Sequence, residues 1–229
     1  VVSATALFGS CREVIKNIIT RYGIKVSFVD GKNIDNWEKE IKPNTKIFFF
    51  ETPSNPCLEL VDIESVCKLA KKNNIKVVVD NILVSPVLQN PSKFGADIIV
   101  YSGTKHIDGQ GRTMGGAILS SEKFREEILK PFLRHTGPCI SPFNAWVLSK
   151  GLETAHLRVV EQSKTAEKVV EFLSKHSKVK SVNYPFKKNH PQYALATKQQ
   201  KMGGNVLSFY IKGNKKEAFN FLNNLKMID

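Results

Sequence analysis

Cysteine is scarce in this sequence of 229 residues, and its four cysteines are far apart. No two of them form a CxxC pair: Cys11, Cys57, Cys67 and Cys139. Structural metal sites and disulfide frameworks are built on closely spaced cysteines, so this spacing argues against both and predicts no metal. Reduced thiols are typical of the cytoplasm, where we expect this protein to reside.

Long apolar runs are also missing. The longest have the length of a strand, KIFFFE at 46–51 and IKVVVDN at 75–81, whereas a membrane helix needs about 20 apolar residues. We therefore expect no contact with a membrane. The first residues, VVSATALFGS, contain neither an initiator Met nor a basic leader and do not resemble a signal peptide. We expect the chain to begin in mid-strand and to lack both ends of a longer protein.

Acidic residues are few relative to basic ones. The 34 Lys and Arg against 21 Asp and Glu give a formal net charge of +13. Such an excess would suit a nucleic acid if it were clustered on one face. Only six of the 34 are Arg, however, and the lysines fall on predicted helix exteriors and loops such as LAKKNNIK and SKHSKVKS. We interpret them as solvated surface that attracts small anions, and we expect no nucleic-acid partner.

Apolar strands alternate with helical segments through the first 120 residues. Helical spacing of apolar residues appears at 10–22, with Ser10 as the expected N-cap, and again in DIESVCKLAKKN, where Asp62 and Ser65 resemble capping signals. The strand-like runs are apolar on both faces: IKVSFVD, KIFFFE, IKVVVDN and ADIIVYS. Strands of this kind are typical of a parallel sheet covered by helices. The sequence therefore predicts an α/β fold with a mostly parallel sheet and helices on both faces.

The pattern changes after GGAILSS. Residues 122–133 and 142–175 have helical spacing, and we expect the longer segment to break near Gly151. Two further strands, KVKSVNYP and NVLSFYIKG, precede the helical KKEAFNFLNNL. Two strands and a helix are too few for an independent core. We therefore expect residues 1–149 to form a partial large domain and residues 150–229 a partial small α/β domain.

Polar residues follow three of the predicted strands at the point where each strand ends. KIFFFE leads into ETPSNP, IKVVVD ends at Asp80, and DIIVYS ends at Ser102. Ligands of open parallel sheets bind beyond the carboxyl ends of the strands. A carboxylate after so apolar a run needs a cation or donors nearby, although Asp80 could instead cap a neighbouring loop.

Two hydroxyls and a lysine are concentrated in YSGTK. A lysine beside a buried strand end can act as a nucleophile or base, although a lone Lys105 would be read as an ordinary surface residue. Ser102 and Thr104 place hydroxyl donors for an anion on either side of Gly103. The stretch has no GxxxxGK[ST] phosphate loop, and GQGRTM has Met114 where a dinucleotide fingerprint needs its third glycine.

An anion-binding Ser and Thr, a reactive Lys and a strand-end Asp are the groups that pyridoxal phosphate (PLP) requires. The stretch from ETPSNPCLELVDI through VVVDN to GADIIVYSGTKHIDGQGRTMGGAIL is similar to the Cys/Met-metabolism, or trans-sulfuration, family of PLP-dependent enzymes of fold type I. The resemblance extends to SPFNAWVLSKGLETAHLR and GGNVLSFYIKG, so it covers nearly the whole chain.

The resemblance implies a cofactor, PLP, and a role for each of its expected ligands. Lys105 corresponds to the Schiff-base lysine, and Asp80 to the partner of the ring nitrogen. Asn55 corresponds to the hydrogen-bond donor to the phenolic oxygen. Ser102 and Thr104 correspond to phosphate ligands.

Phe8 falls where many relatives have a tyrosine that stacks on the cofactor ring. Phenylalanine can stack but cannot exchange a proton, so the resemblance implies no proton-transfer role for Phe8.

The residues after the lysine narrow the implied reaction. Many lyases and synthases of the family have GHSD there, whereas this chain has DGQGR, which resembles the O-succinylhomoserine sulfhydrylase branch. That branch implies an amino-acid substrate, O-succinylhomoserine, which exchanges succinate for sulfide to give homocysteine. The alternatives are an O-acetylhomoserine sulfhydrylase, a cystathionine synthase or lyase, or a truncated non-catalytic remnant. Family members of full length form homodimers, commonly paired into homotetramers.

For several other residues the sequence favours a structural role. We expect His106 to pack or to lie on the surface, and Arg112 either to face a substrate anion or to form an ion pair within its loop. We expect Arg158 to belong to a helix that links the two domains. The tryptophans, Trp37 and Trp146, are expected in a core or an interface.

Overall fold

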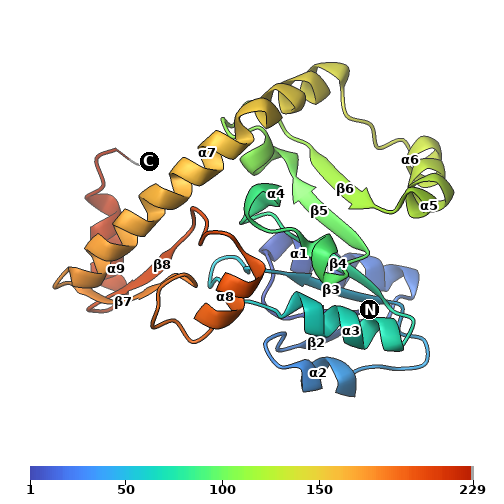
Figure 1. The fold of residues 1–229 in the computed structure, drawn as a ribbon, viewed down its shortest axis with the longest axis horizontal. Coiled ribbons are helices and arrows are strands. Elements are labelled where there is room, and N and C mark those ends of the chain that lie inside the picture. The colour runs from blue at the N-terminus through green and yellow to red at the C-terminus, as the bar shows by residue number, and fades with distance from the viewer. Residues whose placement is uncertain (228–229) are drawn as a thin grey trace.

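A six-stranded sheet forms the centre of the computed structural model, which describes residues 1–227 (Figure 1). The strand order is β2-β1-β3-β4-β5-β6; all neighbours are parallel except β5 and β6. The strands are β1 Val2–Ala4, β2 Ser27–Val29, β3 Ile47–Glu51, β4 Lys76–Asp80, β5 Ile98–Ser102 and β6 Gly116–Ser120. The predicted mostly parallel α/β sheet is confirmed.

The core of this sheet is built on aromatic and β-branched side chains. Trp37, from α2 (Ile34–Lys39), is fully buried, with ring centroids 5.1 Å from Phe48 and 5.7 Å from Phe50 of β3. Helix α3 (Ile63–Lys72) packs beside β4, and the Asp62 side chain accepts the Ser65 N–H at 3.1 Å. The expected cap at Asp62 is therefore present. Trp37 is a core residue, whereas Trp146 is largely exposed.

The first helix starts earlier than the sequence suggested. Helix α1 spans Gly9–Glu13, continues as π- and 3₁₀-helical turns to Tyr22, and ends at Gly23 with φ of 78°. Its N-cap is Phe8, so the prediction of Ser10 as the cap is wrong. The physical reason lies in β3, because the Glu51 side chain accepts the Phe8 N–H at 2.6 Å and fixes the chain just before the helix.

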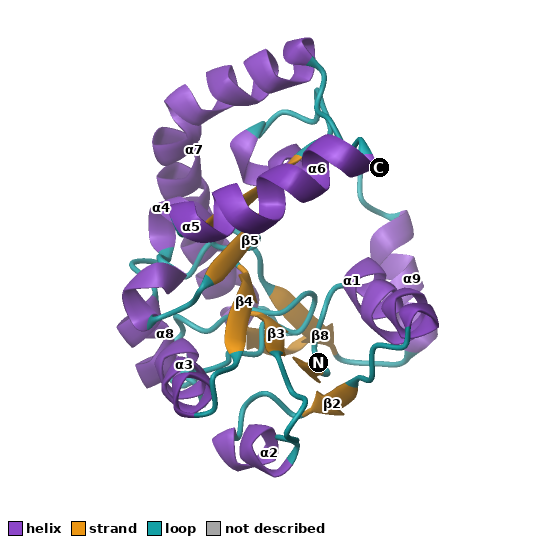
Figure 2. Ribbon diagram, turned by 90° about the vertical axis from the view of Figure 1, so that its right-hand side faces the viewer, coloured by secondary structure: helices purple, strands orange, loops and turns teal. Residues whose placement is uncertain are grey.

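A 34-residue helix, α7 (Pro142–Lys175), runs along one side of the molecule (Figures 1 and 2). The expected break near Gly151 is wrong, because the helix is continuous there. A Cβ at Gly151 would lie 2.2 Å from the Ile107 carbonyl oxygen, so this glycine permits a close approach between two backbones. Since α7 passes through residue 150, the division into domains at 149/150 stays a prediction.

Shorter helices complete the fold around the sheet. Residues 122–133 were expected to be helical, and the chain from Glu122 to Thr136 is helical throughout, although a π-helical turn separates α5 from α6. The short helices are α4 Ser85–Leu88, α5 Glu122–Phe124 and α6 Lys130–Thr136. No helix within residues 1–227 combines the length and the apolarity needed to cross a membrane.

The C-terminal part adds a two-stranded antiparallel sheet of β7 (Val179–Asn183) and β8 (Ser208–Ile211), followed by α9 (Lys215–Asn223). The sequence did not predict α8 (Tyr193–Gln199). This helix and the residue before it contact the segment that connects β3 to β4. The Gln192 side chain exchanges hydrogen bonds with the backbone of Leu60, and Gln199 accepts the Ile63 N–H at 2.8 Å.

Candidate active site

A cavity of about 660 Å³ lies at the carboxyl ends of β3, β4 and β5, and Glu51, Asp80 and Ser102 end these strands on its wall. Parallel neighbours bring these ends to one edge of the sheet. Other segments complete the wall: Phe8, Ser10, Cys11, Asn55, Ile82, Leu83, Val100, Tyr101, Lys105, His106, Gly109, Arg158, Gln162, Asn205 and Val206. The cavity is therefore bounded by both the large sheet and α7.

Most of the residues predicted for the cofactor site meet at this cavity. They are Phe8, Asn55, Asp80, Ser102 and Lys105. Thr104 is not among the lining residues, and its hydroxyl accepts the Gly115 N–H at 3.3 Å. The structure thus gathers widely separated parts of the sequence in one place, while the contact of Thr104 with a phosphate stays a prediction.

Asp80 is a buried carboxylate with weak partners. Its side chain accepts the Ile82 N–H at 3.1 Å, and the Cys11 thiol lies 3.9 Å from its second oxygen. No ion pair among residues 1–227 includes it. Burial raises the pKa of Asp80 to about 6, and no partner within the described residues offsets this rise with an opposite charge.

Glu51 is a second buried acid, which the sequence analysis overlooked. It pairs with Asp80 in the register of β3 and β4 and is 1% exposed. Burial raises the pKa of Glu51 to about 7, while hydrogen bonds from the backbone of Phe8 and Asn55 oppose the rise. The signal was present in the sequence, because KIFFFE ends in a carboxylate just as IKVVVD does.

Lys105 lies in a tight turn that follows β5. The Asp108 N–H donates to the Gly103 carbonyl at 2.9 Å, and the Gly109 N–H donates to the Lys105 carbonyl at 2.7 Å. Lys105 itself departs from helical geometry within this turn, and its side chain is exposed on the cavity wall. The lysine is therefore accessible to a ligand in the cavity.

Arg158 connects α7 to this turn. Its guanidinium donates to the carbonyls of His106 at 3.1 Å, Ile107 at 3.2 Å and Gly151 at 2.8 Å. Arg158 belongs to the linking helix, as expected, and it also lines the cavity. His106 is hydrogen-bonded through Nε2 to the Leu83 carbonyl at 3.1 Å, and burial lowers its pKa.

Arg112 forms an ion pair inside its own loop. Its Nε lies 2.9 Å from an oxygen of the fully buried Asp108, which also accepts the Arg112 backbone N–H at 2.7 Å. Arg112 is not among the residues that line the cavity. Of the two interpretations given for this arginine, the structure shows the ion pair.

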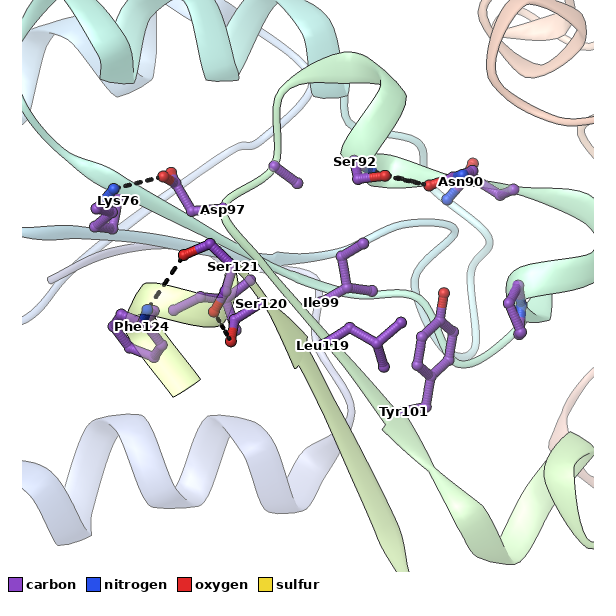
Figure 3. Close-up of a pocket in the computed structure, with 14 residues that line it drawn as sticks. Lys76, Asn90, Ser92, Asp97, Ile99, Tyr101, Leu119, Ser120, Ser121 and Phe124 are labelled. Atoms are coloured by element: carbon purple, nitrogen blue, oxygen red, sulfur yellow. Dashed lines mark hydrogen bonds and ion pairs between the residues drawn. The ribbon is translucent and has the colours of Figure 1, made fainter. Parts of the chain in front are cut away.

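A second cavity, of about 520 Å³, lies toward the opposite end of β4 and β5 (Figure 3). Its charged side chains already pair, with Lys76 2.7 Å from Asp97. The Ser121 hydroxyl accepts the Phe124 N–H at 3.3 Å and so caps α5. This cavity contains none of the predicted site residues, and we do not assign it a ligand.

A lysine and a buried aspartate at the carboxyl edge of a parallel sheet are the arrangement of PLP-dependent α/β enzymes. Residues 1–229 match the family described as Cys/Met metabolism PLP-dependent enzyme. The chain belongs to this family, and the resemblance noted in its sequence is confirmed.

Individual relatives agree with this assignment. The chain is 46% identical over 232 residues to O-succinylhomoserine sulfhydrylase from Mycobacterium tuberculosis, covering 100% of this chain and 57% of that protein. It is 39% identical over 229 residues to L-methionine gamma-lyase from Fusobacterium nucleatum subsp. polymorphum, covering 99% of this chain and 58% of the relative. The crystal structure of metB from Corynebacterium glutamicum superimposes with a TM-score of 0.96 at 36% identity, covering 99% of this chain and 59% of that one. The chain thus spans less than two thirds of the length of these relatives.

Proposed function

We propose that this chain provides the cofactor-binding core of a PLP-dependent sulfhydrylase that replaces the succinyl group of O-succinylhomoserine with sulfide to give homocysteine. The observation that carries the proposal is that one cavity contains both Lys105 and a buried Asp80 carboxylate that forms no ion pair among the described residues. Relatives named O-succinylhomoserine sulfhydrylase, at 46% and 40% identity, support this choice of substrate, as does the DGQGR loop.

The residues present fit PLP. A protonated ring nitrogen would supply the cation that the buried Asp80 lacks, and 660 Å³ is within the range of pockets for ligands of this size, about 300–1,000 Å³. Lys105 would bind the aldehyde, and Asn55 would donate to the phenolic oxygen. Phe8 would stack on the ring, and Ser102, with Thr104 beside it, would hold the phosphate.

When bound, PLP supplies an electron sink beside the substrate's amino group. Asp80, as a carboxylate, would keep the ring nitrogen protonated and so maintain that sink. Lys105, once the substrate amine has displaced it, would move protons between the α and β carbons of the substrate. Phe8 has no ionisable group, so this residue would take no part in proton transfer.

The proposal also specifies the leaving group of the substrate, which is succinate. Relatives named L-methionine gamma-lyase and O-acetyl-L-homoserine sulfhydrylase match at 39% and 36% identity. Enzymes of one family can differ in substrate through a few contacts. Sulfide-dependent release of succinate, compared with release of acetate from O-acetylhomoserine, distinguishes the two sulfhydrylase candidates.

Reductive labelling tests the cofactor site directly. The purified chain is mixed with PLP, its visible absorption is recorded, and borohydride reduction is followed by mass-spectrometric mapping. A single label on Lys105 supports the proposal. Labels scattered over many lysines, or no label, would contradict it and favour a non-catalytic remnant.

A further inference from the structure

Both oxygens of the Glu51 carboxylate are engaged by backbone amides. Oε2 accepts the Phe8 N–H at 2.6 Å, and Oε1 accepts the Asn55 N–H at 3.2 Å. Phe8 precedes Glu51 by 43 residues in the sequence, whereas Asn55 follows Glu51 by four residues. A single buried side chain therefore joins the start of α1 to the loop after β3.

These two partners are residues for which the proposed function requires a defined position. Phe8 would lie on the face of the cofactor ring, and Asn55 would reach its phenolic oxygen. Each reaches the cavity from a segment without regular structure at that point, Phe8 just before α1 and Asn55 in the loop of residues 52–62. Loop residues are positioned only as well as their surroundings hold them.

The chemistry of a carboxylate suits this double contact. Above its raised pKa of about 7, Glu51 is ionised and offers two acceptor oxygens, whereas glutamine offers one acceptor and two donors. An amide at residue 51 would turn its NH₂ toward one of the two N–H groups and leave that donor without an acceptor. Since Glu51 is 1% exposed, water would not readily replace the lost contact.

We propose that Glu51 is a positioning residue, which holds Phe8 and Asn55 in place on the wall of the cofactor cavity through its two oxygens. The inference rests on the proposed function in so far as it assigns PLP to the cavity. Glu51 acts through the two residues and does not itself need to touch the cofactor. Glu51 is paired with Asp80 in the register of β3 and β4. The two hydrogen bonds that Glu51 accepts therefore lie beside the end of β4 that would face the ring nitrogen.

The test compares Glu51→Gln with Glu59→Gln. Glu59 is a matched control, because it lies in the same loop but its side chain pairs with Lys32 at the surface, 3.3 Å away. Amide hydrogen exchange at Phe8 and Asn55 is followed by NMR in the chain without cofactor, and the affinity for PLP is measured by visible absorption. The Val61 N–H, bonded to the Thr52 hydroxyl at 3.0 Å, is an internal reference that Glu51 does not touch.

In Glu51→Gln we expect exchange at Phe8 or Asn55 to rise about tenfold or more, with Val61 unchanged, and the affinity for PLP to fall by at least about fivefold. Glu59→Gln should match the wild type in both measurements. Unchanged exchange at both amides overturns the proposal, and so does faster exchange with unchanged affinity for PLP.

Glu51→Asp covers the case in which the amide variant does not fold. It keeps the charge but is one methylene shorter, so it should lose at least one of the two contacts and show faster exchange at that amide; unchanged exchange at both overturns the proposal. A wild-type chain that binds no PLP contradicts the proposed function, whereas the exchange rates still decide whether Glu51 orders Phe8 and Asn55.

Discussion

The Arg158 guanidinium donates to the backbone carbonyl of His106, 3.1 Å away, and so ties α7 to the residue that follows Lys105. Two further carbonyls, of Ile107 and Gly151, complete its set of backbone acceptors. A side chain placed at Gly109 would collide with it, because a Cβ there would lie 1.7 Å from Nη1. Arg158 therefore contacts the turn that presents Lys105 at His106, Ile107 and Gly109.

Arg158→Lys tests this support. Lysine keeps the charge but has no planar fork, so it cannot serve three carbonyls in the same geometry. We expect a loss of about 1–3 kcal/mol in the free energy of unfolding, measured with urea, and weaker binding of PLP. Lys164→Met, which changes an exposed cation on the same helix, is the control. Equal stabilities for the Arg158 variant and the wild type would show that these hydrogen bonds contribute nothing.

The substitution Lys105→Ala should remove the proposed activity without changing the stability of the fold. The side chain is exposed, so we expect the free energy of unfolding to change by no more than about 0.5 kcal/mol. Borohydride labelling and sulfhydrylase activity should both be lost, since the amine that would bind the cofactor is gone. Lys123→Ala, at another exposed lysine, should keep both. Substantial activity in Lys105→Ala would refute the assignment of this residue.

Asp80 should make the stability of the cofactor-free chain depend on pH. Its pKa is raised by burial from 3.8 to about 6, so between these values the folded state holds a proton that the unfolded state has lost. Stability should therefore fall as pH rises from about 4 to about 6. Asp80→Asn lacks this contribution, and we expect it to gain on the order of 2–3 kcal/mol relative to the wild type between pH 3.5 and pH 7. Urea unfolding at both pH values measures the difference, and a difference independent of pH would rule out the raised pKa.

Gly151→Ala should disrupt the contact between α7 and the turn after Lys105. The new methyl group would meet the Ile107 carbonyl at 2.2 Å, so one of the two backbones must move. We expect a loss of about 2–3 kcal/mol in the free energy of unfolding despite the higher helix propensity of alanine. Gly9→Ala is the matched control, because a Cβ at Gly9 meets nothing within 4 Å. Comparable melting temperatures for the two variants would contradict this account.

The sequence was most informative where the pattern is local. Apolar runs predicted β3, β4 and β5, and the polar residues at their ends led to Asp80, Ser102 and Lys105, because the carboxyl ends of parallel strands meet at one edge. Asp62 was recognised as a cap because its partner, Ser65, lies within one helical turn.

Contacts between distant segments were not predictable in this way. The partners of Arg158 include backbone carbonyls 51 and 52 residues away, which leave no pattern in side-chain types. Gly151 was read as a helix break because only the folded chain shows the backbone that approaches it. Glu51 was passed over for the same reason, since both of its donors are main-chain amides.

The length of α7 has a mechanical consequence. Its first half carries Gly151 and Arg158 against the turn of Lys105, while Ala166 and Val170 in its second half pack with Val182 and Tyr184 beside the small sheet. At 34 residues the helix is about 50 Å long. It therefore joins the small sheet to the turn of Lys105 through one uninterrupted element.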